Sequence, residues 1–544
     1  MLRSPMNMRL VGTVDVAADF YIVYSTSNVP YQDWQGEFLE YTVKSSPDAS
    51  RCQIVRLVSH DARAEDNTYQ LGSDVTFIFP SQTDRLPDGT YYAPLNKPCV
   101  LGSLAAWWMS NAKLDPDAAF VLLDPDMTWH APLAPADIPA RGTINGHLWT
   151  ADGHVMYPLV IRASDLHRMS AAYLRHTIAE YEKRDDYHAE MYGFMEAAQE
   201  CGLRERVDPS FGPTAGHGNF DQYTAARFLH YCQHFLVRDE SRWFKQSYTA
   251  MTLRHPWERP PLSHVVEDEG QRDVLDRLHD LITYQTRTGV RPRRIEVDAN
   301  GSLLDVHLWA IADDEEALRE QCRWSLETAR KNGLLPRLAG VGDDTGHLAH
   351  CEHAADLSRF YVLRKLLSGV ADTRLFLLMS GFDTLVKGSE EQIVDTFLRC
   401  NTEILVSAER TYTYQWPEFR HKYDATASHY RYVGSGAIMG FAGALKRMME
   451  QSIHDIEHGF GHGNHQGLTG KYVHDHFGDT THVRLDTECR LFWVIGDDAR
   501  AFAESPFRNP YTQTTPCILR VLGGNRENAE LYRQVGERIA AARA

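Results

Sequence analysis

The chain has 544 residues, and its 73 acidic and 56 basic side chains give a formal net charge of −17. This length corresponds to two or three domains, and a composition with 43% hydrophobic, 11% aromatic and 24% charged residues is that of a globular protein. Disordered and collagen-like chains are excluded. The acidic balance argues against duplex nucleic acid and acidic membrane surfaces as partners, because binding to phosphate groups requires a basic footprint.

The sequence shows no sign of a membrane or secretory segment. No apolar run approaches the ~20 residues needed to cross a bilayer, and residues 1–15 lack the apolar core of a signal peptide. Nine cysteines are too few and too scattered for a disulfide scaffold, and their odd number leaves at least one unpaired. We therefore expect a cytoplasmic protein with reduced thiols.

Short apolar runs alternate with amphipathic segments over residues 1–255, which predicts an α/β domain. A polar connector follows at 256–300, and the same layout returns in a second domain at 301–544. The expected strands lie at 20–24, 54–58, 118–123, 303–311 and 375–379. One expected helix begins at residue 30, and three others span 271–282, 314–329 and 528–544.

Asp124 and Asp126 directly follow the expected strand 118–123. Ligands of open α/β sheets lie beyond the carboxyl ends of the strands. Two carboxylates one residue apart can share a hard cation such as Mn(II) or Mg(II), which would neutralise a diphosphate leaving group. This is the logic of the Asp-x-Asp motif of nucleotide-sugar glycosyltransferases. Asp-Pro-Asp also favours turns, so an ordinary turn is the alternative interpretation.

Six segments of the first half, in order, resemble the plant hydroxyproline O-arabinosyltransferase and peptidyl-serine α-galactosyltransferase family. The resemblance implies a GT-A-like fold and a retaining transfer from a UDP-sugar to a peptide or protein hydroxyl. The segments are Pro-Tyr-Gln-Asp-Trp-Gln at 30–35, Tyr-Ala-Pro-Leu-Asn-Lys-Pro at 92–98, Leu-Leu-Asp-Pro-Asp-Met-Thr-Trp at 122–129, Tyr-Pro-Leu-Val-Ile at 157–161, Glu-Met-Tyr-Gly-Phe at 190–194 and His-Tyr-Cys-Gln at 230–233.

The resemblance implies a cation bound by Asp124, Asp126 and His230. A late histidine commonly completes the metal site of such folds, and a packed core histidine is the alternative for His230. Asn96 and Lys97 become candidate contacts to the nucleotide sugar. Their alternative is an ordinary Asn-Lys-Pro turn.

Glu190 is the candidate carboxylate of the sugar-side pocket, with Asp185 and Asp186 as rivals. Lys245 could meet the diphosphate as a cation. The alternatives are a charge on a helix surface for Glu190 and a solvated side chain for Lys245.

The second half resembles the glycosyltransferase domain of the collagen lysyl hydroxylases, which transfers glucose to galactosyl-hydroxylysine. The matching segments are Asp-Val-His-Leu-Trp-Ala at 305–310, Ser-Gly-Phe-Asp at 380–383, Val-Ser-Ala-Glu at 406–409, Gly-Ser-Gly at 434–436 and Leu-Asp-Thr-Glu-Cys at 485–489. The candidate donor contacts are Asp383, Glu409, Gly434, Ser435, Gly436 and Arg520.

This half departs from the pattern that the resemblance implies. The first metal-binding aspartate falls on Ser380, the paired acids fall near residues 464–465, and the late histidine falls near Arg520. Asp383 alone is a poor site for Mn(II) or Mg(II). Arg520 could supply positive charge in a metal-independent enzyme, but an inactive or binding-only domain is the preferred interpretation. The Gly-Ser-Gly turn lets backbone approach a sugar closely, or is a plain tight turn.

Two groups of histidines could bind zinc. Exposed helix faces and loops are the preferred interpretation, because no Cys-x-x-Cys pair accompanies either group. The groups are His454, His458, His462 and His465, and His347, His350, Cys351 and His353.

Taken together, the sequence predicts two tandem GT-A-like domains, Rossmann-like with mixed sheets, of which the first is a metal-dependent glycosyltransferase. The acceptor is a peptide, a protein or another hydroxylated molecule; a hydroxylated base in phage DNA stays open, although the acidic charge argues against it. The alternatives are a non-catalytic carbohydrate- or peptide-binding protein and a zinc hydrolase.

Overall fold

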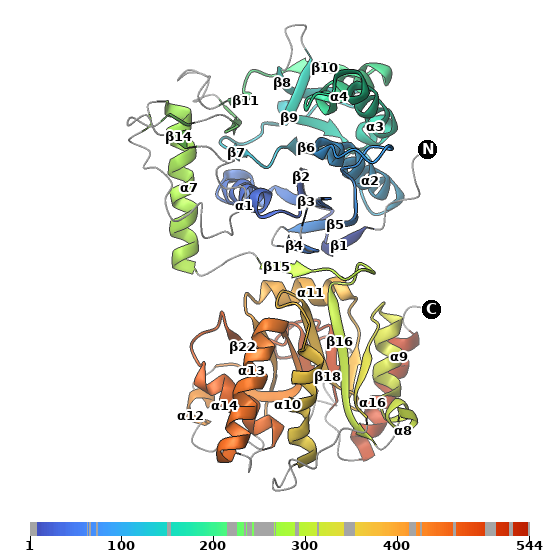
Figure 1. Ribbon diagram of the computed structural model, residues 1–544, viewed down its shortest axis with the longest axis vertical. Coiled ribbons are helices and arrows are strands. Elements are labelled where there is room, and N and C mark those ends of the chain that lie inside the picture. The colour runs from blue at the N-terminus through green and yellow to red at the C-terminus, as the bar shows by residue number, and fades with distance from the viewer. Residues whose placement is uncertain are drawn as a thin grey trace. The chain divides into compact units, whose positions relative to one another are not determined.

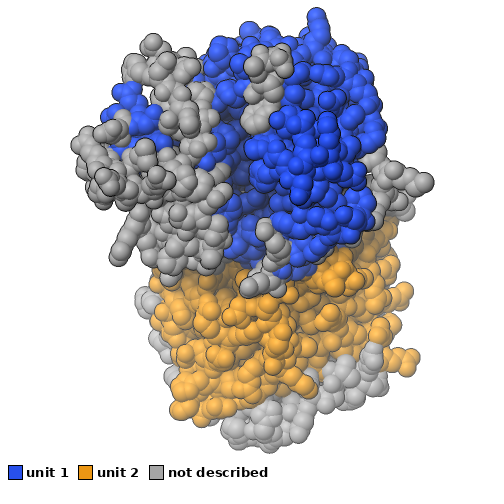
Figure 2. All heavy atoms as spheres, turned by 45° about the horizontal axis from the view of Figure 1, so that its top comes forward, with its two compact units in different colours: residues 1–294 blue, residues 295–544 orange. Residues whose placement is uncertain are grey.

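The computed structural model describes residues 8–62, 64, 67–71, 74–148, 154–214, 226–232, 235–236, 242–243, 266, 268–288, 293–312, 315–341, 354–412, 420–424, 427–460, 464–495, 507–521 and 526–541. The chain divides into two compact units, residues 1–294 and 295–544 (Figure 2). The boundary falls inside the predicted connector 256–300, which also contains helix α7 (Glu269–Thr288). Among the described residues, no helix combines the length and the apolar character needed to span a membrane.

Unit 1 is built on a mixed eight-stranded sheet in the order β1-β5-β3-β2-β6-β9-β8-β10 (Figure 1). Its centre is parallel, with β2 between β3 and β6, whereas β9 runs antiparallel to both β6 and β8. The central strands are buried along their whole length, as the continuous apolar runs predicted. The strands are β1 (Arg9–Gly12), β2 (Phe20–Ser27), β3 (Cys52–His60), β5 (Val75–Gln82), β6 (Ala119–Leu123), β8 (Thr143–Leu148), β9 (Val155–Arg162) and β10 (Arg204–Val207).

Helices complete unit 1 around this sheet. α1 (Pro30–Lys44) begins at a proline, whose fixed φ suits the first helical position. α2 (Asn96–Ser110) precedes β6, and α3 (Ala163–Arg184) with α4 (Ala189–Glu200) follows β9. Figure 1 shows α2, α3 and α4 gathered on one side of the unit.

A small second sheet at the end of β6 in unit 1 has the order β11-β12-β7. It contains β7 (Met127–Trp129), β11 (Phe211–Thr214) and β12 (Phe228–His230). The rings of Trp129 and Phe228 pack edge to face with their centroids 4.9 Å apart, so they lock β7 against β12.

Unit 2 contains a six-stranded mixed sheet in the order β17-β16-β18-β21-β20-β22 and a three-stranded sheet in the order β19-β24-β23. The strands of the large sheet are β16 (Leu304–Ala312), β17 (Arg337–Val341), β18 (Leu375–Ser380), β20 (Ile404–Glu409), β21 (Tyr432–Phe441) and β22 (Val483–Leu485). The small sheet contains β19 (Thr384–Val386), β23 (Phe492–Val494) and β24 (Ile518–Arg520). The helices are α8 (Glu315–Gln321), α9 (Arg323–Lys331), α10 (Ala354–Leu367), α11 (Glu390–Arg399), α12 (Arg420–Asp424), α13 (Ala442–Asp455), α14 (His465–Asp475) and α16 (Arg526–Ala541).

The two large sheets share one topology. The run β3-β2-β6-β9-β8-β10 of unit 1 and the run β17-β16-β18-β21-β20-β22 of unit 2 have the same order along the sheet. Each neighbouring pair also has the same direction in both runs: parallel, parallel, antiparallel, antiparallel and parallel. The predicted repetition of an α/β layout is therefore confirmed as a repeated strand order.

One predicted helix is two helices. The sequence pattern predicted a single helix over 314–329, but α8 and α9 are separated at Cys322. The side chain of Cys322 is fully buried, and its Sγ would lie 2.2 Å from a Cβ placed on Gly381. The interruption is confined to this residue, because its N–H still donates to the carbonyl of Leu318 (3.0 Å) and its carbonyl still accepts from the N–H of Leu326 (2.9 Å).

Gly193 provides a test of the packing that holds α4 against α3. A Cβ on Gly193 would lie 2.5 Å from the backbone nitrogen of Thr177 and 2.6 Å from its Cα, so the helices would have to separate. We expect Gly193→Ala to lower the free energy of unfolding by about 2 kcal/mol, as overpacking does. Urea unfolding measures this change.

Gly102→Ala is the matched control, because Gly102 also lies in a helix, α2, beside α3. Its Cβ would meet only the side chain of Ser170, at 3.3 Å. Alanine is favoured over glycine in helices by up to about 1 kcal/mol, so this variant should keep or slightly raise stability. Equal losses in both variants would contradict the packing argument.

Candidate functional site

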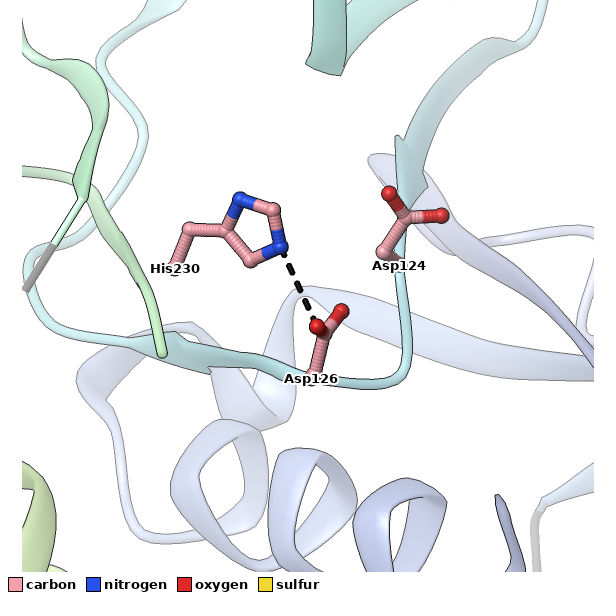
Figure 3. Close-up of side chains that lie close together, drawn as sticks. All are labelled: Asp124, Asp126 and His230. Atoms are coloured by element: carbon pink, nitrogen blue, oxygen red, sulfur yellow. Dashed lines mark hydrogen bonds and ion pairs between the residues drawn. The ribbon is translucent and has the colours of Figure 1, made fainter. Parts of the chain in front are cut away.

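Three side chains meet at the carboxyl end of β6: Asp124, Asp126 and His230 (Figure 3). One candidate ligand atom from each lies within 4.8 Å of those of the other two. His230 Nε2 lies 3.2 Å from Asp126 Oδ2. The three side chains are only 8 to 22% exposed, so they are sheltered without being sealed from solvent.

The fold brings these residues together through strand pairing. Asp124 to Asp126 form the link between β6 and β7, and β7 pairs antiparallel with β12. In this register His230 lies opposite Met127, the residue that follows Asp126. The backbone nitrogen of Tyr231 also donates to the carbonyl of Asp126 (3.1 Å), which fixes the turn.

Lys97 connects this cluster to Glu190. Its Nζ lies 2.5 Å from Asp124 Oδ1 and 3.7 Å from Glu190 Oε2. Burial disfavours the charged ammonium, but the carboxylates of Asp124 and Glu190 outweigh it and raise the pKa of Lys97. Burial also raises the pKa of Glu190 to about 7, although Lys97 opposes this shift.

A set of tyrosines surrounds the Lys97–Glu190 pair, and sequence reasoning did not single them out. Tyr173 donates its hydroxyl to Glu190 Oε1, and Tyr92 accepts from the backbone nitrogen of Glu190 (2.8 Å). Lys97 Nζ lies 4.5 Å from the ring centroid of Tyr157, a cation–π contact. These contacts hold both charged groups in one orientation.

Asn96 is committed to the scaffold. Its Nδ2 donates to Ser27 Oγ and Ser59 Oγ, both at 3.2 Å, and thereby links the ends of β2 and β3. The predicted contact to a nucleotide sugar would therefore compete with these bonds.

The remaining site residues predicted for unit 1 are Asp185, Asp186 and Lys245. None of them belongs to the cluster of Asp124, Asp126, His230, Lys97 and Glu190 within the described residues. Asp185 is exposed at the left-handed C-terminal end of α3 and interacts with Tyr181. Asp186 pairs with His188 Nδ1 at 2.9 Å, with 41% of its side chain exposed. Lys245 lies outside the described residues.

In unit 2 a guanidinium group occupies the corresponding place. Arg520 Nε lies 3.1 Å from Asp383 Oδ2, and Arg520 Nη1 lies 2.9 Å from Glu409 Oε1. Burial opposes the charge of Arg520, but the two carboxylates outweigh it and raise the pKa of the arginine. Burial raises the pKa of Glu409, which Arg520 in turn lowers.

The two units place these residues in the same register. In unit 2, β19 pairs antiparallel with β24, so that Arg520 lies opposite Thr384, the residue that follows Asp383. This repeats the pairing of His230 with Met127, the residue that follows Asp126. Arg520 is thus the topological counterpart of His230.

Gly434 and Gly436 make room for this ion pair. A Cβ on Gly434 would lie 2.6 Å from Glu409 Cγ, and one on Gly436 would lie 2.0 Å from Arg520 Cζ. The sequence analysis predicted that the Gly-Ser-Gly turn lets the backbone approach a sugar closely. The space beside the two glycines is instead occupied by the side chains of Glu409 and Arg520. Ser435 lies between them, fully buried, and its Oγ makes no hydrogen bond within the described part of the chain.

The positions at which unit 2 departs from the expected metal pattern gather at one cavity of about 200 Å³. Ser380, His465 and Arg520 line it, together with Trp309 and the buried Arg359 of α10. The sequence analysis missed Trp309 and Arg359. Aligning the halves by strand order would have indicated Arg359, because α10 precedes β18 just as α2, which carries Lys97, precedes β6.

The histidine groups form no metal cluster within the described ranges, where Asp124, Asp126 and His230 are the one group of this kind. His454 and His458 are exposed, and their ring centroids lie 3.9 Å apart with the ring planes tilted by 33°. His462 and the group His347, His350, Cys351 and His353 lie outside the described residues.

Residues 320–535 match the family model of the PLOD GT domain, which is a glycosyltransferase domain. The match lies within unit 2. The chain therefore contains a glycosyltransferase domain. With the two mixed sheets, this confirms the predicted fold class of α/β glycosyltransferase domains and the resemblance of the second half. The resemblance of the first half stays a prediction, and no curated protein matches the sequence.

Solved glycosyltransferases are similar at low identity. One, involved in glycosylation of the major capsid of PBCV-1, is 12% identical over 43% of this chain and 98% of its own (TM-score 0.29). The galactosyltransferase LgtC is 15% identical over 43% and 95% of the two chains (TM-score 0.31). Mouse xyloside xylosyltransferase 1 is 13% identical over 41% and 99% (TM-score 0.28).

Lys97→Met tests the buried charge cluster. Removing the ammonium leaves Glu190 and Asp124 without their cation, which should lower the free energy of unfolding by about 3 kcal/mol at pH 8. The loss should shrink at pH 5. Glu190 has a folded-state pKa raised from 4.5 to about 7, so its contribution to stability is present below pH 4.5 and is lost as the pH rises through about 7. Urea unfolding at both pH values measures this.

Lys183→Met is the control for loss of a lysine charge in the same unit. Lys183 is 64% exposed and pairs with Glu180 at 3.1 Å. Surface pairs contribute at most about 1 kcal/mol, so little change is expected at either pH. A Lys97 variant as stable as this control would contradict the proposed cluster.

Proposed function

We propose that unit 1 is a metal-dependent glycosyltransferase that moves a pentose or hexose from a UDP-sugar to a hydroxyl group. The observation that carries the proposal is the meeting of Asp124, Asp126 and His230 at the carboxyl end of a central strand. This is where α/β sheets place their ligands. The glycosyltransferase family of unit 2, together with the repeated strand order, supports the same class of chemistry for unit 1.

The donor set suits a divalent cation. Two carboxylates and an imidazole offer hard oxygen ligands and one nitrogen, a combination that fits Mn(II) and, less well, Mg(II). The carboxylates of Asp124, Asp126 and Glu190 outnumber the single ammonium of Lys97, so the site has a formal charge that a divalent cation would balance. A bound cation would supply positive charge next to a departing diphosphate.

The protein's own side chains position the remaining groups. Lys97, held by Tyr157 and Glu190, can donate hydrogen bonds to the diphosphate as the bond between the sugar C1 and the phosphate oxygen breaks. The acceptor oxygen forms the new bond to C1, and its proton passes to the leaving diphosphate, which gives UDP as the second product. Retention of the anomeric configuration follows from the resemblance of the first half alone.

Glu190 is the carboxylate that α4 brings to this cluster. Its burial, its contact with Lys97 and the hydrogen bond from Tyr173 set it apart from the exposed Asp185 and the half-buried Asp186. We assign it to the sugar side of the site, where it can hold a hydroxyl of the donor or the acceptor. The acceptor is a hydroxyl of a peptide, a protein or another hydroxylated molecule.

Asp126→Asn tests the proposed metal site. With a panel of UDP-sugars and Mn(II), we expect the wild-type protein to release UDP and the variant to lose at least 100-fold in rate, since a cation ligand is removed. EDTA should abolish the wild-type reaction. Measured UDP release with and without Mn(II) gives both results.

Asp383→Asn is the matched control in unit 2, where the corresponding carboxylate pairs with Arg520. This variant should keep the Mn(II)-dependent release of UDP. Release that survives Asp126→Asn but disappears in Asp383→Asn would place the chemistry in unit 2. Binding of sugars without any release of UDP would favour the alternative, a non-catalytic carbohydrate- or peptide-binding protein.

A further inference from the structure

The cavity in unit 2 has a wall with the chemistry of an anion site. It measures about 200 Å³, and two guanidinium groups, those of Arg359 and Arg520, line it together with the imidazole of His465. No carboxylate is among the described residues that line it. Arg359 is only 4% exposed, so this charge is buried within the protein rather than spread on its surface.

Arg520 is oriented by the two acids next to it. Its Nε and Nη1 are engaged by Asp383 and Glu409, whereas its Nη2 makes no hydrogen bond with any described residue. The guanidinium lies between the two carboxylates, so these cannot close around a divalent cation. They fix the arginine and leave one N–H edge for a ligand.

The charges of the two units differ in a consistent way. In unit 1, three carboxylates face one ammonium around Asp124, Asp126, Glu190 and Lys97. In unit 2, the carboxylates of Asp383 and Glu409 both pair with the guanidinium group of Arg520, and a second arginine, Arg359, lines the same cavity. Unit 2 therefore carries within its own sequence the positive charge that unit 1 lacks.

We propose that the unit 2 cavity binds a diphosphate group through Arg359 and Arg520 without a divalent cation. Planar guanidinium groups match phosphate oxygens with paired, charge-assisted hydrogen bonds. The proposal concerns unit 2 alone and does not depend on the function proposed for unit 1.

Two further features of the cavity point to an oxygen-rich ligand. Ser380 is 5% exposed, and its Oγ makes no hydrogen bond with the described residues, so a buried donor is available at the cavity wall. His465 is the first residue of α14, so the N-terminal end of this 11-residue helix borders the cavity, where its dipole favours negative charge.

The size of the cavity limits the ligand. A volume of about 200 Å³ lies below the roughly 300 to 1,000 Å³ of pockets that enclose drug-sized molecules. It suits the diphosphate portion of a ligand, with any sugar or nucleoside extending out of the cavity. Inorganic pyrophosphate and UDP are therefore the two probes, and their comparison separates a free diphosphate from a nucleotide.

The test uses the full chain carrying Asp126→Asn, in EDTA, so that unit 1 holds no cation. Isothermal titration calorimetry should show that pyrophosphate or UDP binds, and Arg359→Gln should weaken that binding at least tenfold. Arg364→Gln, an exposed arginine on the same helix, should leave the affinity unchanged. Tighter binding of UDP than of pyrophosphate would identify a nucleotide ligand.

Absence of binding by both probes in EDTA would overturn the proposal, as would equal affinities of the Arg359 and Arg364 variants. Binding that appears only when Mn(II) is added would also overturn it. Circular dichroism confirms folding of each variant.

Ser380→Ala gives a second variant that preserves the charge pairs. Because its hydroxyl has no partner in the described structure, its removal should not affect stability, and it should weaken pyrophosphate binding two- to fivefold. If Ser380→Ala binds pyrophosphate as tightly as the parent protein while a folded Arg359→Gln variant does not bind it, the anion site is supported and Ser380 is not part of it. An unchanged affinity in both variants would overturn the proposal.

Discussion

The antiparallel pairing of a short strand with the segment that leaves the central sheet determines the chemistry of both units. In unit 1 the pairing of β7 with β12 places His230 beside the acids that follow β6. In unit 2 the pairing of β19 with β24 places Arg520 beside Asp383. Equivalent strand pairings therefore place an imidazole next to the acids in unit 1 and a guanidinium next to them in unit 2.

This single difference changes what each site can hold. An imidazole can ligate a cation and leaves the neighbouring carboxylates available to do so. A guanidinium cannot ligate a cation, and it engages the carboxylates in ion pairs of 2.9 and 3.1 Å. One scaffold thus carries the proposed cation site in unit 1 and, in unit 2, an arginine that is held by two carboxylates.

The supporting residues follow the same logic in both units. Lys97 on α2 and Arg359 on α10 come from helices that precede equivalent strands, and both bring positive charge to their sites. Glu190 is the second residue of α4, and Gln466 is the second residue of α14, so a buried acid in unit 1 has a neutral counterpart in unit 2. Gln466 donates to Glu409 and to the carbonyl of Val433, which ties it into the charge cluster.

Much of this protein could be predicted from local sequence. Apolar runs and turn residues determined the buried strands and the repeated α/β plan, because burial on both faces of a sheet leaves a direct imprint on hydrophobicity. The paired acids Asp124 and Asp126 were visible because they follow a strand directly. Ordered motifs identified the glycosyltransferase domain that the family match confirms.

The family resemblance had indicated that His230 joins Asp124 and Asp126, but only the tertiary structure shows how the distant residues of each unit are brought together. The positions of His230 and Arg520 depend on pairing across 104 and 137 residues, respectively, and no local pattern records which strand a short segment will join. The filling of the space beside Gly434 and Gly436 and the burial of Arg359 are likewise results of packing between remote elements. Sequence determined which chemical groups were present, whereas long-range pairing decided which of them neutralise one another.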